Sequence, residues 1–212
     1  MKKFICLLFI GLLIPVMAAA QDVTENVTDN ESSFSFGPHI GFHFFSCKDV
    51  NQYIKDDLSE YMVTGGTTNM FLAFDLGFDL KKMMTENLAI KLGVDWLLAP
   101  KFATADNGES FSYLFSGISL SAAGLVFIPL SKKVSLIFGA GPDYYFTKFE
   151  DFAGSGFGGR AQFGIRTKYD FEISLIGRYA KIKNDKTVNG TTPDFLMDFT
   201  GVEINCVKYF EL

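Results

Sequence analysis

The chain has 212 residues, 48% of them hydrophobic, and a formal net charge of −5. This acidic balance argues against nucleic acid as a partner, because phosphate backbones are bound by clustered Lys and Arg. The length is within reach of one domain. After the leader described next, Cys47 and Cys206 are the only cysteines, so a disulfide framework is not expected.

The first 20 residues have the pattern of a secretory signal peptide. Lys2 and Lys3 form a charged start, an apolar stretch follows, and residues 18–20 are all Ala. We predict cleavage before Gln21, because signal peptidase needs small residues there and the apolar stretch is too short for a transmembrane anchor. Residues 21–32 carry four acidic and no basic residues, without apolar periodicity. They are predicted to be a disordered acidic segment preceding a single domain at 33–212.

Eight segments of that domain carry an apolar residue at every second position. Alternation with a period of two predicts strands that have one apolar and one polar face. The fourth segment is the least regular, because Tyr113 and Phe115 share a face with Gly117 and Ser119. In chain order the segments are 33–44, 69–80, 88–98, 111–130, 134–144, 157–166, 171–179 and 196–210.

The connections between these segments alternate in length. Long connections are predicted at 46–68, 100–110, 147–156 and 184–194, and short ones at 81–87, 131–133 and 168–170. Long and short connections therefore fall at opposite ends of the sheet. This is typical of an all-β, eight-stranded antiparallel up-and-down transmembrane β-barrel, with termini and short turns in the periplasm and long loops outside the cell.

A soluble eight-stranded barrel, such as a lipocalin, shows the same alternation with its faces reversed. The polar face here consists mainly of Gly, Ser and Ala, which suits a narrow lumen better than a water-exposed surface. Aromatic residues also gather near the ends of the apolar face, as expected of interfacial girdles. The predicted girdle residues are Trp96, Tyr144 and Tyr179 towards the loops, and Phe34, Phe78, Phe171 and Phe210 towards the turns.

Two stretches carry a family resemblance. The hairpin Gly124–Pro142 resembles the central hairpin of small bacterial outer-membrane barrels, including OmpX-like, OmpA-transmembrane-like and Bacteroidetes-type families. The end of the chain, with Tyr209 and Phe210, is similar to their C-terminal assembly signal, although Lys208 stands at an expected apolar position. The resemblance implies a bacterial outer-membrane location and contacts with outer-membrane lipids, lipopolysaccharide and the assembly machinery. It implies no cofactor or activity, and we expect a monomer.

Charged residues on the polar faces form the most informative set of candidate site residues. Inside a narrow barrel such charges must pair or retain water, because an isolated buried charge is costly. We predict a salt-bridged network that rigidifies the lumen, with Arg166 opposite Glu172. A narrow conduit for water or small solutes is the alternative. The set comprises Asp75, Asp79, Lys91, Asp95, Asp143, Arg160, Arg166, Glu172, Arg178 and Glu203.

Other signals for chemistry are weak. His39 and His43 share a face but lie about 13 Å apart along a strand, so they cannot bind one metal without further ligands. Residues 154–159 match Gly-x-Gly-x-x-Gly, but they lead from a loop into a strand rather than into a helix. We therefore predict no catalytic, cofactor or metal site, with a lipid A-modifying enzyme as a third possibility. The predicted function is a structural, adhesive or surface-interaction role, and loop 47–69 is the candidate site for an extracellular ligand.

Overall fold

The computed structural model describes residues 34–59, 63–65, 71–105, 107–184 and 195–212. The predicted signal peptide and the acidic segment 21–32 lie outside the described residues. Most of the predicted connection 184–194 lies outside them as well. Residues 33–212 group as one structural unit.

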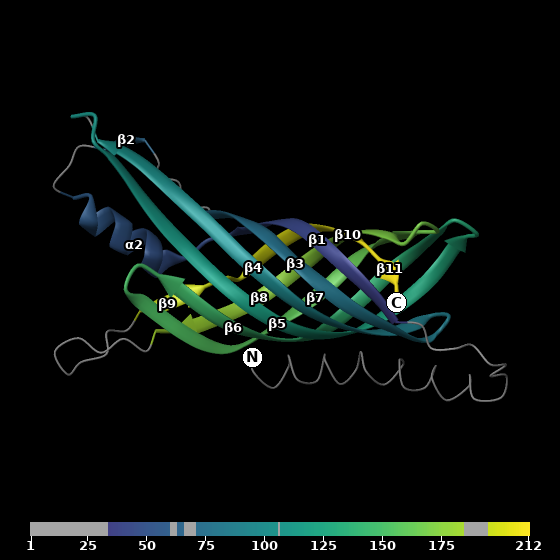
Figure 1. Ribbon diagram of the computed structural model, residues 1–212. Helices are drawn as coiled ribbons and strands as arrows, with labels where there is room; N and C mark the ends of the chain where they lie inside the picture. Colours follow the sequence, from purple (N-terminus) through teal and green to yellow (C-terminus); the bar gives the residue numbers. More distant parts are fainter. Residues whose placement is uncertain (1–33, 60–62, 66–70, 106, 185–194) are drawn as a thin grey trace. The chain divides into compact units, whose positions relative to one another are not determined.

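Eight antiparallel strands form a closed ring in this unit (Figure 1). Each pairs with the next along the chain, and β10 pairs with both β1 and β8, which closes the ring. The predicted eight-stranded antiparallel up-and-down barrel is confirmed. Its strands are β1 (Phe34–Phe45), β3 (Phe71–Thr85), β4 (Leu88–Ala105), β5 (Ser110–Ser131), β6 (Val134–Phe149), β7 (Phe152–Thr167), β8 (Phe171–Lys183) and β10 (Gly201–Lys208).

Three shorter strands extend the ring at its ends. β2 (Val63–Gly65) pairs with β4, β9 (Leu196–Asp198) pairs with β8, and β11 (Phe210–Glu211) pairs with β1. The predicted eighth segment is thus divided into β9, β10 and β11. The first break lies at Phe199, whose side chain is buried in the lumen.

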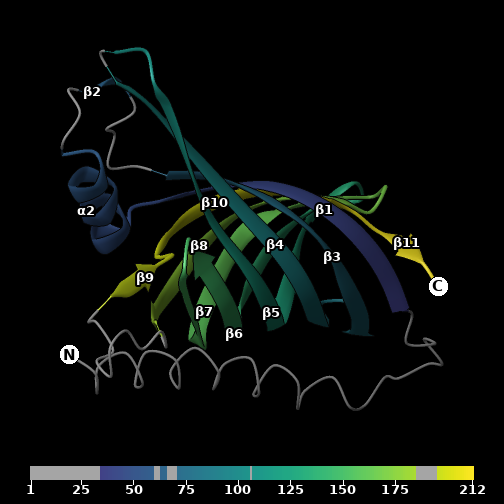
Figure 2. The same ribbon diagram turned by 60° about the vertical axis from the view of Figure 1, so that its left-hand side comes forward.

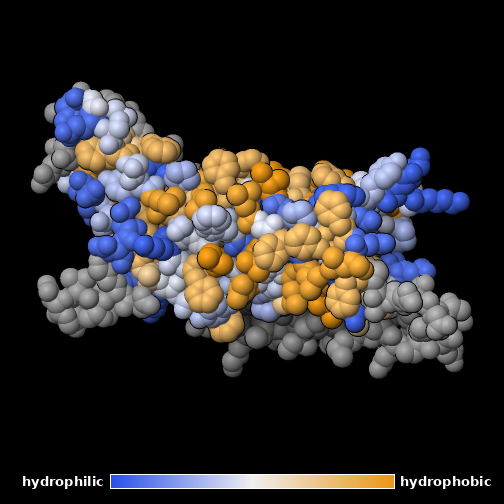
Figure 3. Space-filling model, viewed as in Figure 1, coloured by the Kyte–Doolittle hydropathy of each residue, from blue (hydrophilic) through white to orange (hydrophobic). Residues whose placement is uncertain are grey.

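The two faces of the wall follow the predicted alternation. In β1 and β8, exposed and buried residues alternate along the whole strand. The exposed positions are mostly Phe, Leu and Ile, and the buried ones face the lumen. Apolar residues cover the middle of the visible outer face, and hydrophilic residues gather at both ends (Figure 3).

Two of the predicted long connections are wrong, because strands continue through them. β6 runs to Phe149 and β7 begins at Phe152, so the predicted loop 147–156 is reduced to a turn at 150–151, where Glu150 has a φ of 48°. In the predicted loop 100–110, β4 continues to Ala105 and β5 begins at Ser110. These two strands extend beyond their neighbours towards β2 (Figure 1). The predicted short connections 131–133 and 168–170 are tight turns, but β3 continues to Thr85, so the predicted connection 81–87 is reduced to a turn at 86–87.

The predicted loop 46–68 contains a helix, α2 (Lys48–Asp57), which lies at the same end of the barrel as β9 (Figure 2). Its buried residues include Val50 and Ile54, four positions apart and therefore on one side of the helix. Leu58, directly after it, is buried as well. No helix in the described part of the chain has the length and hydrophobicity needed to cross a membrane.

Candidate functional site

The structure places nine of the ten predicted charged residues in the lumen with their side chains buried. Arg166 differs, because it is near the turn end and its side chain is 24% exposed. It is the register partner of Glu172, as predicted, but Nε is 4.0 Å from that carboxylate. Its closer partner is Asp170, on the following turn, at 2.5 Å.

Two guanidinium groups organise the centre of the lumen. Arg178 donates to Glu203 (2.5 Å), Asp75 (2.8 Å) and Asp95 (2.9 Å). Arg160 donates to Asp95 at 2.5 Å and also to Asp143. Asp95 thus joins both guanidinium groups and connects β4 with β7 and β8. Removing one member of such a buried network typically costs about 3–5 kcal/mol, because its partners are left as uncompensated charges.

Hydroxyl groups complete this network. Ser119 donates to Asp95 at 2.6 Å and Tyr145 donates to Asp143 at 2.8 Å. Tyr209, on the other side of the lumen, donates to Asp79 at 3.0 Å. These partners were not among the predicted site residues, although each lies on the inward face of its segment.

His39 lies beside three carboxylates of the same layer. Its Nε2 is 3.1 Å from Asp95 Oδ1 and 3.8 Å from Asp75 Oδ1, and its Nδ1 is 3.7 Å from Asp79 Oδ2. Asp79 Oδ2 also lies 3.4 Å from the amino group of Lys91. His43 belongs to another layer, where its ring packs near Phe45 and Phe199. The two histidines do not converge on one point.

Strand register explains why these groups meet. One row across the wall joins His39 of β1, Gly77 of β3, Asp95 of β4 and Ser119 of β5. A Cβ atom at Gly77 would lie 2.6 Å from His39 Nε2, so only glycine leaves room for the imidazole beside Asp95. The inward glycines of the sequence pattern thus create the space that the charged side chains occupy.

The turn end of the lumen holds a separate ion pair and an apolar layer. Lys81 is buried, 2.6 Å from Glu172 and 3.3 Å from the centre of the Tyr209 ring. The sequence pattern placed Lys81 in a turn, but β3 continues past it and keeps it on the inward face with Asp79. The apolar layer packs beside this pair and consists of Ala89, Ala123, Leu125, Phe127 and Ile137, with Met83 against it.

The loop end of the lumen is filled by aromatic side chains beneath α2. Phe115 and Phe199 stack at 4.4 Å between ring centres, and Phe45 lies 5.2 Å from Phe199. Val50 and Ile54 of α2 belong to the same cluster. We refer to this cluster as the aromatic plug; its main members are Phe45, Phe71, Phe115, Phe149, Phe195, Phe199, Leu97, Met197, Ile182, Val50, Ile54 and Leu58.

Polar contacts fix α2 above the plug. The Lys101 amino group donates to Asn51 at 2.9 Å, and the Tyr113 hydroxyl donates to Asp57 at 2.5 Å. Cys47, which precedes the helix, donates to the Leu196 carbonyl and accepts from the Asp198 amide, both at 3.2 Å. Burial raises the pKa of the Cys47 thiol. Cys47 and Cys206 are both free thiols.

The predicted girdle residues lie on the outer face. Trp96 and Tyr179 are 53% and 61% exposed, and Tyr144 is half-buried. Phe34, Phe78, Phe171 and Phe210 are all exposed. Lys208 stands at a position expected to be apolar, and its amino group donates to the carbonyl of Tyr169 on the neighbouring turn.

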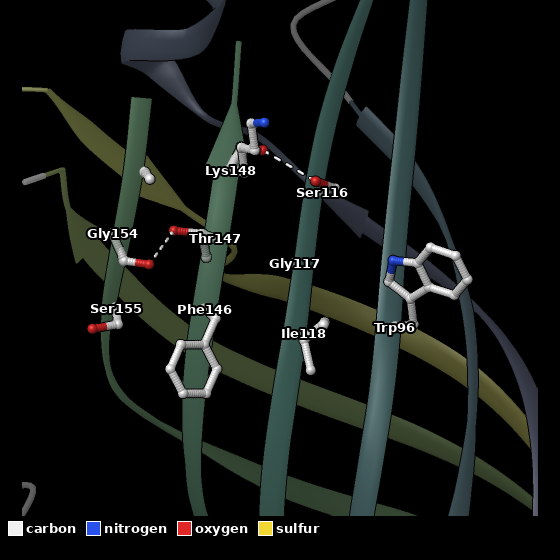
Figure 4. A pocket seen from close by; sticks show the side chains of 10 residues that line it. Trp96, Ser116, Gly117, Ile118, Phe146, Thr147, Lys148, Gly154 and Ser155 are labelled. Carbon is white, nitrogen blue, oxygen red and sulfur yellow. Dashed lines mark hydrogen bonds between the residues drawn. The ribbon is translucent and has the colours of Figure 1, made fainter. Parts of the chain in front are cut away.

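A groove of about 390 Å³ crosses the outer face of β4 to β7 (Figure 4). Its apolar wall contains Trp96, Ile118 and Phe146, which lie in one register row. The next row towards the loops contains Ser116 and Lys148. Polar side chains of β5 and β6 therefore join the apolar outer face at this level of the wall.

Comparisons with known proteins find no matching family model and no matching curated protein. Among solved structures, the attachment invasion locus protein Ail of Yersinia pestis, in complex with the heparin analogue sucrose octasulfate, is 14% identical with a TM-score of 0.39, covering 85% of this chain and 97% of that one. A second Ail structure gives a TM-score of 0.37 at the same identity and coverage. An outer membrane channel from Pseudomonas putida F1 is 10% identical with a TM-score of 0.33, covering 87% of this chain and all of that one. Similarities at this level assign no function.

Proposed function

We propose that this protein is an integral outer-membrane β-barrel that acts through its loop-end surface in a structural, adhesive or other surface-interaction role. The observation that carries the proposal is a closed barrel whose outer face is apolar while its lumen is filled. An apolar outer face suits lipid, and a filled lumen leaves the loop end as the surface available to partners.

The apolar belt supports the membrane location. Side chains such as Leu92, Trp96 and Leu175 are about half exposed, and similar residues surround them on every long strand. A soluble monomer rarely exposes contiguous apolar patches larger than a few hundred Å². Transfer to lipid removes such surface from water at about 25 cal/mol per Å². We expect the mature chain to fractionate with outer membranes and to shift in gel mobility on boiling; folding in detergent-free buffer would contradict the membrane location.

The filled lumen disfavours the channel alternative. A solute would have to pass the aromatic plug, the central charged layer and the apolar layer at the turn end. We expect no stepwise conductance when purified protein is added to planar bilayers. Reproducible ion conductance by the wild-type barrel would favour the channel role instead.

The position of the histidines disfavours a lipid A-modifying enzyme. His39 and His43 are buried in the lumen rather than presented on the lipid-facing side. A lipid substrate at the outer face would have no access to either ring. Incubation with lipopolysaccharide, followed by mass spectrometry of lipid A, is expected to show no change in acylation.

The extension of β4 and β5 is the best candidate contact surface. It carries Phe102, which is 68% exposed, and Leu114, which is 48% exposed, both beyond the level of the groove. We expect Phe102→Ser with Leu114→Ser to reduce attachment of barrel-expressing bacteria to protein-coated surfaces. Ser112→Ala is the matched control, because Ser112 is the exposed register partner of Phe102. This substitution removes no apolar surface. Equal attachment by all variants would exclude this surface.

A further inference from the structure

Several buried polar atoms around His39 have no hydrogen-bond partner. Neither ring nitrogen of His39 makes a hydrogen bond, although the side chain is only 2% exposed. The Oδ1 atoms of Asp75, Asp79 and Asp95 are also unpartnered. In each of these carboxylates, Oδ2 accepts a hydrogen bond from the network described above, whereas Oδ1 accepts none. Unsatisfied polar atoms are uncommon in folded interiors, and four such side chains at one place require an explanation.

The geometry at His39 does not fit a proton shared along a hydrogen bond. Nε2 and Asp95 Oδ1 are 3.1 Å apart, but they are not aligned for an N–H···O interaction. Two ligands of one metal ion behave differently. With metal–ligand bonds of about 2.1 Å they lie roughly 3.0–3.4 Å apart, and each points at the ion rather than at the other. The short, misaligned contact therefore fits two ligands of a common ion.

The charge of the central layer points in the same direction. Five carboxylates, Asp75, Asp79, Asp95, Asp143 and Glu203, are buried there with three bases, Lys91, Arg160 and Arg178. With His39 in the neutral form that can bind a metal, five negative against three positive groups leave a formal charge of −2, and a protonated ring would leave −1. A buried uncompensated charge is costly. One divalent cation would neutralise this layer.

We infer that the lumen contains a structural site for one divalent transition-metal ion, with His39, Asp79 and Asp95 as ligands and Asp75 beside them. One ligand atom from each of the three residues lies within 4.8 Å of the others. Shortening these separations by up to about 1.5 Å would bring the three atoms to the spacing of roughly 3.0–3.4 Å expected of ligands of one ion. An imidazole together with carboxylates favours Zn²⁺ and its neighbours over Mg²⁺ or Ca²⁺.

Such a site has a consequence for how the metal is acquired. Because the aromatic plug and the apolar turn-end layer lie on either side of the charged layer, the ion must enter before the barrel closes. Metal binding would then be coupled to folding. The predicted absence of a metal site considered only the two histidines together; the structure instead brings His39 to carboxylates of β3 and β4.

The test uses the untagged mature chain, which is unfolded, stripped of metal and refolded into detergent with or without ZnCl₂. After dialysis against a chelator, the zinc content of the folded barrel is measured by mass spectrometry. We expect one zinc ion per chain when zinc is present during folding, and background levels when zinc is added afterwards. Background levels in both samples would overturn the inference.

Two variants and one control identify the ligands. His39→Gln and Asp79→Asn are each expected to lose the retained zinc. Asp143→Asn is the matched control, because it removes a buried carboxylate of the same layer that is held by Arg160 and Tyr145 instead. It should retain zinc as wild type does. Zinc retention by folded His39→Gln equal to that of wild type would refute the site.

A spectroscopic measurement keeps the inference testable if the variants do not fold. Zinc-edge X-ray absorption of the wild-type barrel should show one imidazole nitrogen with carboxylate oxygens. The chain has only two histidines, so His43→Gln distinguishes them and should leave the spectrum unchanged. A shell without imidazole, or one that changes in His43→Gln, would contradict the assignment.

Discussion

The central charged layer and the aromatic plug fill the same barrel in different ways. The charged layer uses directional contacts, with Arg178 bound to three carboxylates from three strands. The plug uses the volume and stacking of aromatic rings, such as Phe115 on Phe199. Strands of one ring supply both layers, and the same alternation turns their side chains inward. Alternation therefore determines which residues enter the lumen, whereas residue type determines whether a layer is held by charge or by shape.

The largest expected effect comes from removing charge at the centre. Arg178→Met leaves Glu203, Asp75 and Asp95 without their shared partner, so we expect a loss of about 3–5 kcal/mol in the free energy of unfolding. The measurement is reversible urea unfolding in detergent micelles. Arg166→Met is the control, because Arg166 is partly exposed and its loss should cost about 1 kcal/mol or less. Equal costs for both variants would contradict a central role for Arg178.

The plug should respond to volume instead of charge. Phe199→Ala removes a fully buried ring that stacks on Phe115, and we expect a cost of about 3–5 kcal/mol. Phe199→Leu keeps most of the apolar volume and should cost less than about 1.5 kcal/mol. Thermal unfolding of both variants in micelles provides the comparison. Equal losses of stability in Phe199→Ala and Phe199→Leu would show that the plug is not held by packing.

The outer face provides a third environment for comparison. Leu92 is 51% exposed in the middle of the apolar belt, so Leu92→Arg should cost roughly 2–4 kcal/mol if lipid or detergent covers it. The neighbouring position, Gly93, faces the lumen, where a Cβ would lie 2.6 Å from Asp79 Oδ1. Unfolding in micelles measures the Leu92→Arg effect. A variant as stable as wild type would argue against a lipid-facing Leu92.

Much of the fold was predictable because its signal is local. The ring of eight strands and the inward position of the charged residues follow from periodicity within each segment, as in β1 and β8. The predicted loop 147–156 is wrong, and it contains Gly154 and Gly156. In the structure those glycines are strand positions in close contact with β8, and a Cβ at Gly154 would lie 2.2 Å from the Lys183 carbonyl oxygen.

The partners within the site could not be predicted from one sequence. Asp95 meets Arg160 and Arg178 across the lumen, 65 and 83 residues away, and such contacts depend on the stagger of the closed ring rather than on any one strand. The helix α2 did have a signal. Val50, Ile54 and Leu58 recur every four residues, a spacing typical of one face of a helix.

The smallest expected effect concerns the junction of α2 and the plug. The alkylation rate of Cys47 at this junction distinguishes local opening of the loop end from global unfolding of the barrel. Cys47 is fully buried, and its raised thiol pKa leaves less thiolate at neutral pH, so alkylation should require the loop end to open. With Cys206→Ser, the alkylation rate of the folded barrel reports on Cys47 alone, and stability should stay near that of wild type. If the loop end opens independently, Arg178→Met should leave this rate unchanged although it lowers global stability. If the two layers open together, the rate should rise in proportion to the lost stability.

A disulfide between Cys47 and Cys206 in non-reducing peptide mapping would contradict the register, because β1 pairs Cys206 with Ile40, seven residues before Cys47.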